Sequence, residues 1–217
     1  MCFFYCSLKT PSFTVLLTLE VIKLQRKFNP GCSPNQYQED GKTFNFPDLT
    51  TELCPYCKAA CLKKHGFYTR YLITFGFEGE IIIRRYCCHI CCKTVSLLPS
   101  FCHPKRVYGI LAIVGILNEF YVKMSAACLA VTNFLQETGV ECSRQLLLHY
   151  RRRIEKNLNN LVMAITDIYA LRAPPVTEKT NMKEKVRQLL HSIRSPLDTS
   201  LKIFERTRTT YLTLQAI

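Results

Sequence analysis

The chain has 217 residues, and its hydrophobic content of 48% is typical of a protein that folds into one ordinary domain or two small ones. Composition therefore excludes wholesale disorder. The longest apolar runs, residues 13–19 and 107–117, are shorter than the roughly 20 residues that a membrane-spanning helix needs. Residues 1–7 carry no basic side chain and no small-residue cleavage site follows them. We therefore expect no membrane span, no secretory signal and a cytoplasmic location.

The net charge of +13 is unevenly distributed along the chain. Residues 54–106 carry +7 and residues 144–217 carry +8, whereas residues 1–53 are neutral and residues 107–143 carry −2. Two basic blocks favour a polyanionic partner such as nucleic acid. A basic surface that only keeps the protein soluble is the alternative.

The residue pattern predicts an α+β protein, in which a small β-hairpin zinc ribbon precedes an all-helical region. We expect four segments: an N-terminal segment of unassigned role at 1–53, the ribbon at 54–102, the helical region at 105–170 and a basic C-terminal tail at 171–217. Asn, Pro, Gly and Ser cluster at residues 29–35, which predicts a loop there.

The interior of the second segment alternates like a β-hairpin. Strands are expected near residues 65–75 and 80–86, joined by a turn at residues 76–79 with a glycine at each end. Three consecutive β-branched residues, Ile81 to Ile83, support the second strand.

Two C-x2-C pairs, separated by 30 residues, bound this hairpin: Cys54-Pro55-Tyr56-Cys57 and Cys88-His89-Ile90-Cys91. Two thiolates that flank two residues can curl around one ion, and a second pair completes a tetrahedral site with four sulfur ligands. Such a site has no open position for water. We therefore predict one structural Zn²⁺ bound by Cys54, Cys57, Cys88 and Cys91.

Several alternatives to this ligand set remain open. The four cysteines could be buried free thiols, or they could hold iron, which uses the same ligands. Cys87 and Cys92 lie beside two proposed ligands, but only Cys88 and Cys91 reproduce the spacing of the first pair. A histidine could replace a sulfur, and the candidates are His65, His89 and His103. The remaining cysteines considered, which we expect to be packing thiols, are Cys61, Cys102, Cys128 and Cys142.

The pattern becomes helical after Pro104. A first helix at about residues 105–121 is apolar nearly all round, as in a buried helix. Ser125 is expected to cap a second helix that stops at Gly139, and Ser143 to cap a third that runs to about residue 170. An apolar helix end, a glycine and then a capped second helix predict a helix-turn-helix in this region. The tail has one more helical stretch at about residues 178–193.

The third helix has an apolar stripe and a basic strip on opposite faces. At about 100° per residue, the stripe that predicts the core consists of Leu147, Tyr150, Ile154, Leu158, Leu161 and Ile165. The opposite strip, with donors suited to base edges and phosphates, consists of Gln145, His149, Arg152, Arg153 and Lys156. Ser143 and Arg144 are placed for phosphate contact at the helix start. Arg151 lies near the edge of the stripe, so we expect it to contact the DNA backbone or Glu155. A solvated charged face is the alternative to DNA contact.

The ribbon resembles the zinc-ribbon head of bacterial insertion-sequence transposases and, more narrowly, an uncharacterised bacterial domain family in which a ribbon precedes helix-turn-helix segments. The likeness covers about residues 47–161, and its motifs are Cys54-Pro55-Tyr56-Cys57, residues 64–70, residues 83–86 leading into Cys88-His89-Ile90-Cys91, and residues 94–99. Cys92 departs from these ribbons, which commonly place glycine after the second pair.

The sequence contains no sign of a nuclease domain that would complete a transposase. Its four aspartates lie in unlike contexts, at Asp40, Asp48, Asp167 and Asp198. We therefore expect a non-catalytic, zinc-stabilised protein that binds double-stranded DNA, either an accessory protein of a mobile element or a remnant of one. A homo-oligomer and a separate transposase subunit are open as partners. The alternatives are a protein-interaction adaptor and a binder of single-stranded nucleic acid, which the basic and aromatic residues of the ribbon would permit: Lys63, Lys64, Tyr68, Arg70, Arg84 and Arg85.

Overall fold

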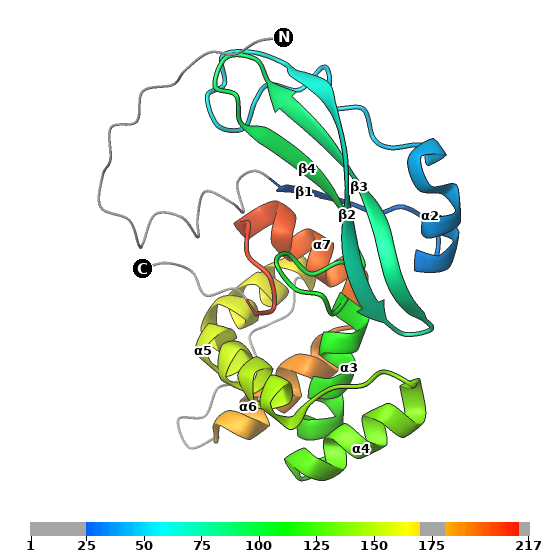
Figure 1. Cartoon of the computed structure of the whole chain (residues 1–217). Helices are drawn as coiled ribbons and strands as arrows, with labels where there is room; N and C mark the ends of the chain where they lie inside the picture. Colours follow the sequence, from blue (N-terminus) through cyan, green and yellow to red (C-terminus); the bar gives the residue numbers. More distant parts are fainter. Residues whose placement is uncertain (1–24, 170–180, 213–217) are drawn as a thin grey trace, which may run out of the picture.

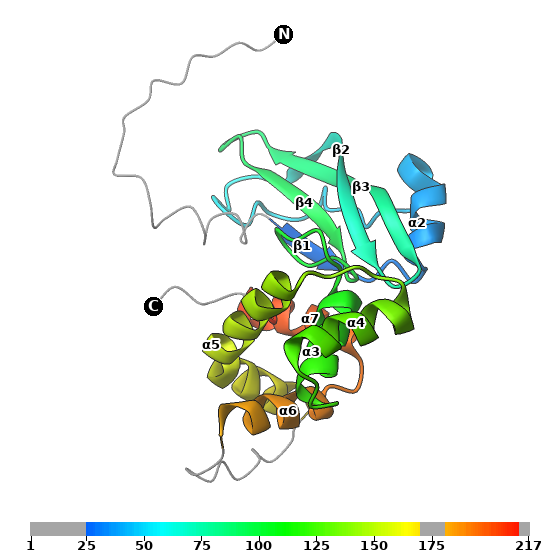
Figure 2. The same ribbon diagram turned by 60° about the horizontal axis from the view of Figure 1, so that its bottom comes forward.

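The structure, a computed structural model, describes residues 25–169 and 181–212. These residues form a mixed fold with one four-stranded β-sheet and six α-helices. Figure 1 shows the sheet in the upper half of the molecule and most of the helices in the lower half. Figure 2 shows that this group of helices lies below the sheet, while one short helix lies at the side.

The sheet has the strand order β1-β4-β3-β2. Its strands are β1 (Gln25–Phe28), β2 (Leu62–Thr74), β3 (Phe77–Cys88) and β4 (Thr94–Pro99). Strands β2 and β3 form the predicted antiparallel hairpin, from Thr74 paired with Phe77 to Leu62 paired with Cys88. The predicted turn at residues 76–79 was too long, because β3 already begins at Phe77 and only Phe75 and Gly76 lie between the strands. Gly76 has a φ of +65°, which suits glycine in a tight turn.

Residues 25–43 lie against this sheet. Strand β1 pairs in parallel with β4, from Gln25 with Ser96 to Phe28 with Pro99. Helix α2 (Pro34–Asp40) and the 3-10 turn η1 (Gly41–Thr43) contact β3. The loop expected at residues 29–35 therefore ends earlier than predicted, because Ser33 caps α2 by accepting a hydrogen bond from the backbone N–H of Gln36.

Five further helices follow the sheet: α3 (Ile110–Tyr121), α4 (Ala127–Thr138), α5 (Arg144–Tyr169), α6 (Met182–Ser192) and α7 (Pro196–Thr207). The first four were predicted, and α7 was not. Helix α3 begins at Ile110 rather than near residue 105, since residues 100–109 form turns and a short bridge to Ile73. The residue at the start of α4 is Ala126, which makes no side-chain cap, so the expected cap at Ser125 was wrong. None of the described helices has the length and apolarity to cross a membrane.

Two hydrophobic cores, one in the sheet and one among the helices, both contact Leu197 of α7, and the tip of the hairpin makes a further contact with the helices. The ring of Phe75, in the hairpin turn, lies 5.9 Å from the ring of Phe134 in α4. A Cβ atom at Gly115 of α3 would lie 2.7 Å from Phe75 and 2.9 Å from Phe134. Only glycine at this position therefore lets α3 approach both rings.

A group of buried polar side chains forms a second connection between the two parts. The Lys27 ammonium of β1 donates a hydrogen bond to the Ser200 hydroxyl of α7 at 2.8 Å. Burial lowers the pKa of His103 to about 3, so this imidazole is neutral. Its Nε2 accepts from the Thr210 hydroxyl at 2.8 Å, and its Nδ1 donates to the Pro104 carbonyl at 2.7 Å. These contacts fix the residues after α7 against the connection from β4 to α3.

The buried Lys27 predicts a specific dependence of stability on pH. Burial lowers its pKa from 10.5 to about 7, so between these values the unfolded chain holds more protons than the folded chain. The free energy of unfolding should therefore rise with pH in this window, by about 1.6 kcal/mol between pH 7 and pH 8.5. Urea unfolding at a series of pH values measures this rise.

Lys27→Met should remove this rise while it keeps the side-chain volume. Lys42→Met is the matched control, because Lys42 is exposed on η1, and it should unfold with the wild-type pH dependence. An identical pH dependence in the Lys27→Met variant and the wild type would contradict a buried, weakly basic lysine.

Candidate metal centre and basic helix face

Four cysteine side chains converge at the end of the hairpin away from the helices. Cys54 and Cys57 lie in the turn before β2, Cys88 ends β3, and Cys91 lies in the connection to β4. All four Sγ atoms lie within 4.8 Å of one another. Cys54 Sγ is 3.6 Å from Cys91 Sγ, and Cys57 Sγ is 3.6 Å from Cys88 Sγ.

These distances fit a tetrahedral metal site. Metal–sulfur bonds of about 2.3 Å in tetrahedral geometry place sulfur atoms about 3.8 Å apart, whereas a disulfide joins them at about 2.05 Å. The four cysteines could therefore hold one metal ion, as their spacing predicted. Within residues 25–169 and 181–212 they form the one group of three or more Cys, His, Asp or Glu side chains close enough to do so.

The backbone around the two pairs has matching geometry. The residue after each second cysteine is left-handed, with a φ of +57° at Lys58 and +55° at Cys92. Cys92 therefore adopts a left-handed conformation that favours glycine, although it carries a side chain. Backbone N–H groups of Cys91 and Ile90 donate to the Cys88 sulfur and lower the pKa of that thiol, whereas burial raises the pKa of the Cys91 thiol. The backbone donors therefore favour the thiolate at Cys88, and the thiolate is the form of cysteine that binds a metal.

The other candidate ligands lie outside this cluster. His65 and His89 are exposed, and His103 is buried in the connection to α3. Cys87 and Cys92 are not members of the group either. Among the expected packing thiols, Cys102 and Cys142 are buried as predicted, but Cys61 and Cys128 are exposed. Cys128 is exposed because it lies on the solvent side of α4, whose buried residues are Ala130 and Phe134.

Helix α5 divides into a buried and an exposed face, as its periodicity predicted. All six residues of the expected core stripe are buried. Ser143 caps the helix, since its hydroxyl accepts a hydrogen bond from the backbone N–H of Leu146 at 3.2 Å. The side chains predicted to contact DNA lie on the accessible face: Ser143, Arg144, Gln145, Arg152 and Lys156 are exposed, and His149 and Arg153 are half-buried.

Arg151 is directed away from this face, and its expected contact with Glu155 is confirmed. Its Nε lies 3.0 Å from the Glu155 carboxylate, which also accepts from the Tyr121 hydroxyl at 2.8 Å. Of the three consecutive arginines, Arg151 is therefore paired within the protein, and Arg152 and Arg153 carry the basic strip.

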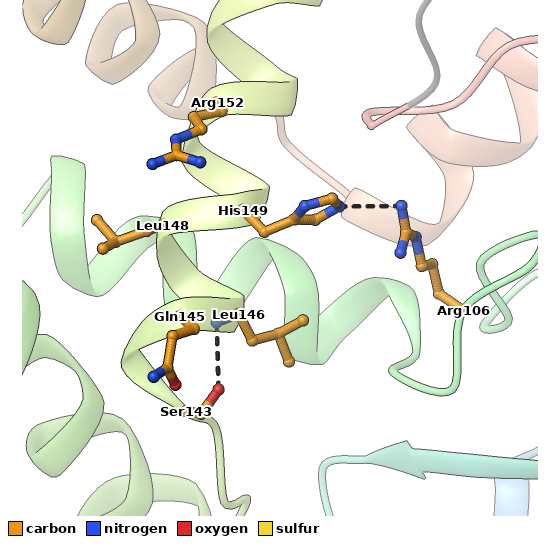
Figure 3. A pocket seen from close by; sticks show the side chains of 7 residues that line it. All are labelled: Arg106, Ser143, Gln145, Leu146, Leu148, His149 and Arg152. Atoms are coloured by element: carbon orange, nitrogen blue, oxygen red, sulfur yellow. Dashed lines mark hydrogen bonds between the residues drawn. The ribbon is translucent and has the colours of Figure 1, made fainter.

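The start of α5 lines a hollow of about 580 Å³ on the surface (Figure 3). Its lining residues are Arg106, Ser143, Gln145, Leu146, Leu148, His149 and Arg152. Four of the predicted site residues thus line one concave surface. Charged side chains that were merely exposed on a helix face would not form such a hollow. The lining includes two arginines and no carboxylate.

Arg106 is a member of this surface that the sequence analysis did not identify. It precedes α3, and its Nη2 lies 3.1 Å from His149 Nε2. Burial lowers the pKa of His149, and the nearby Arg106, Arg153 and Arg152 lower it further. The neutral ring therefore accepts the hydrogen bond from Arg106. Arg106 lies 43 residues before His149, so helical periodicity could not connect them.

Comparison with known proteins adds one match. A family described as a domain of unknown function, DUF6431, matches residues 54–132, from the first cysteine of the metal cluster into α4. This match agrees with the expected likeness to an uncharacterised domain and joins the hairpin and α3 in one recurring unit. Neither the curated proteins nor the solved structures include a match to the chain.

The cysteine cluster predicts metal content that can be measured directly. Protein purified without added metal should contain about one metal ion per chain by elemental analysis, because the four sulfur ligands are already arranged for it. Cys54→Ser combined with Cys88→Ser should abolish this content, since it removes one ligand from each pair.

Cys61→Ser combined with Cys128→Ser is the matched control, because both thiols are exposed and lie outside the cluster. This variant should retain the metal. Metal-free wild-type protein that is folded, or full metal retention in the Cys54/Cys88 variant, would exclude the proposed ligands.

Proposed function

We propose that the chain is a non-catalytic protein that binds duplex DNA through the exposed face of α5 and is stabilised by one zinc ion. The observation that carries this proposal is the hollow at the start of α5. Its arginine, glutamine and serine side chains are hydrogen-bond donors suited to phosphates and base edges, and no carboxylate lines it.

The connection from α4 to α5 supports a helix-turn-helix arrangement. Helix α4 ends at Thr138, Gly139 is left-handed with a φ of +69°, and α5 begins at Arg144. In helix-turn-helix proteins the second helix enters the major groove, and its N-terminal residues contact base edges. The hollow lies at this end of α5, and the buried stripe faces the other helices, so the basic strip is accessible to DNA.

Zinc is the metal that we propose for the four cysteines. Zinc prefers tetrahedral thiolate sites, and when it is bound it cross-links the two cysteine pairs without redox chemistry. Because four sulfur ligands fill the coordination sphere, the site is structural. If elemental analysis finds iron in place of zinc, the proposed metal is wrong and the proposed ligands remain the same.

We further propose that the chain is related to the N-terminal regions of insertion-sequence transposases, as an accessory protein or a remnant of a mobile element. Support comes from the ribbon motifs that the sequence shares with that class. Its function would then be to recognise DNA for a partner, which is either a second copy of the chain or a separate transposase subunit.

Exposed apolar side chains near the metal centre favour a second candidate, a protein-interaction adaptor. Leu53, Tyr56 and Ile90 are 54%, 44% and 57% exposed. Binding of single-stranded nucleic acid has less support, since it needs free aromatic faces. Tyr68, the aromatic residue of that alternative, has the Arg85 guanidinium 5.8 Å from its ring centre.

Removal of two charges from the basic strip should weaken DNA binding without unfolding the protein. Arg152→Ala combined with Arg153→Ala leaves the buried stripe of α5 intact, and each lost phosphate contact should lower the slope of log affinity against log salt by about one unit. Fluorescence anisotropy with a labelled duplex at several salt concentrations measures this slope.

Lys202→Ala combined with Arg206→Ala on α7 is the matched control, because it removes the same charge from another helix. It should keep the wild-type slope. If both double variants behave like the wild type, the adaptor becomes the better interpretation of the basic face.

The protein should neither cleave nor join DNA in the presence of Mg²⁺ or Mn²⁺. Strand transfer by a two-metal site needs carboxylates that converge on metal ions about 4 Å apart. In the described residues no group of three carboxylates lies close enough to bind a metal. Supercoiled plasmid should remain supercoiled after incubation with the protein. Metal-dependent nicking that disappears in Asp167→Asn or Asp198→Asn would show that the chain is an enzyme.

A further inference from the structure

Arg106 enters the hollow from outside the helix-turn-helix segment. It lies in the connection between β4 and α3, and its guanidinium is directed toward His149 of α5 (Figure 3). Figure 3 also shows that Arg152 and Leu148 extend to the opposite side of α5. The two arginines therefore flank the hollow, one on each side of the helix.

The hairpin fixes the backbone from which Arg106 extends. Arg70 of β2 donates through Nη2 to the backbone carbonyls of His103 and Arg106. The same turn is closed by a hydrogen bond from the Arg106 N–H to the His103 carbonyl at 3.3 Å. His103 is itself buried and bonded to Thr210. Arg106 is thus a side chain on a well-supported turn, and little conformational freedom is lost when it binds a ligand.

The positive charge around this turn favours the binding of an anion. Arg106, Arg152 and Arg153 all lower the pKa of His149. Among the described residues, none of these three arginines has an ion pair with a carboxylate. Like charges held together without a counter-charge repel one another, and a bound anion relieves that repulsion. A guanidinium is also suited to bidentate contact with a phosphate.

We infer that Arg106 binds a phosphate of the DNA backbone, on the side of α5 opposite Arg152. This inference rests on the proposed function, and it extends the DNA-binding surface from α5 onto the turn that Arg70 supports. A helix in the major groove has a phosphate backbone on each side of it, so a cation on either side of α5 matches that geometry. Arg106 and Arg152 then fix the orientation of α5 in the groove, while Gln145, which lines the same hollow, contacts bases.

The test compares Arg106→Gln, Arg106→Lys and Lys105→Gln in the full-length, metal-loaded chain. Lys105 is the matched control, since it is the exposed neighbour of Arg106 and does not line the hollow. The probe is a labelled duplex of random sequence, and the quantity measured is the slope of log affinity against log salt. Metal content and thermal unfolding check that each variant is folded. We expect all three variants to fold, because the Arg106 carbonyl, not its side chain, holds the turn.

Arg106→Gln should lower the slope by about one unit. Arg106→Lys should retain the wild-type slope because it keeps the charge, and Lys105→Gln should retain it because it removes a charge that lies elsewhere. Equal slopes for Arg106→Gln and Lys105→Gln would overturn the inference. If Arg152→Ala combined with Arg153→Ala still lowers the slope in that case, the proposed function stands without Arg106. Wild-type protein that does not bind the duplex would overturn both.

Discussion

The convergence of four cysteine sulfurs is the constraint on which the rest of the structure depends. Four thiols within 4.8 Å of one another are in a stable arrangement as thiolates only when a cation compensates their repulsion. The sulfurs connect the turn before β2 to the end of β3, so they join both strands of a long hairpin at one end. Because the two strands are joined at this end, the far end of the hairpin also has a defined position, and so do the contacts that it makes with the helices.

Two of those contacts determine how the helices are placed. Phe75, in the hairpin turn, packs where Gly115 of α3 leaves room for it, and Arg70 holds the turn that contains His103 and Arg106. From this turn the side chain of Arg106 reaches His149 of α5. A continuous series of contacts therefore leads from the cysteine cluster to the basic surface. In our proposal the ribbon does not contact the bases, and its role is to hold the turn beside the helix that does.

Local sequence patterns predicted the parts of the fold that depend on nearby residues. The two C-x2-C pairs identified the cysteine cluster, because ligand spacing is set by the geometry of a single turn. Helical periodicity placed the core stripe of α5, and Ser143 was recognised as its cap. Each of these features involves residues that are close in sequence or related by a matched motif.

Features that depend on distant residues could not be predicted in the same way. Strand β1 is four residues long and is stabilised by parallel pairing with β4, about 70 residues later. Helix α7 lies in a segment rich in Thr and Arg, and its burial depends on contacts with α5 and β1. The sequence pattern placed Arg106 in a helix that was expected to begin near residue 105. Only the turn that ends at Ile110 places it beside His149. The hollow at the start of α5 is therefore a product of tertiary structure, although most of its residues lie on one predicted helix.

The affinity of the metal-loaded, full-length chain for duplex DNA, measured over a series of salt concentrations, tests the central claim most directly. The account predicts binding at low salt and a steep, linear loss of log affinity with log salt, as phosphates neutralised by arginine release their counterions. It also predicts that duplex DNA is preferred over a single strand of the same length. Absence of binding at low salt, or an affinity for duplex that does not change with salt, would contradict it.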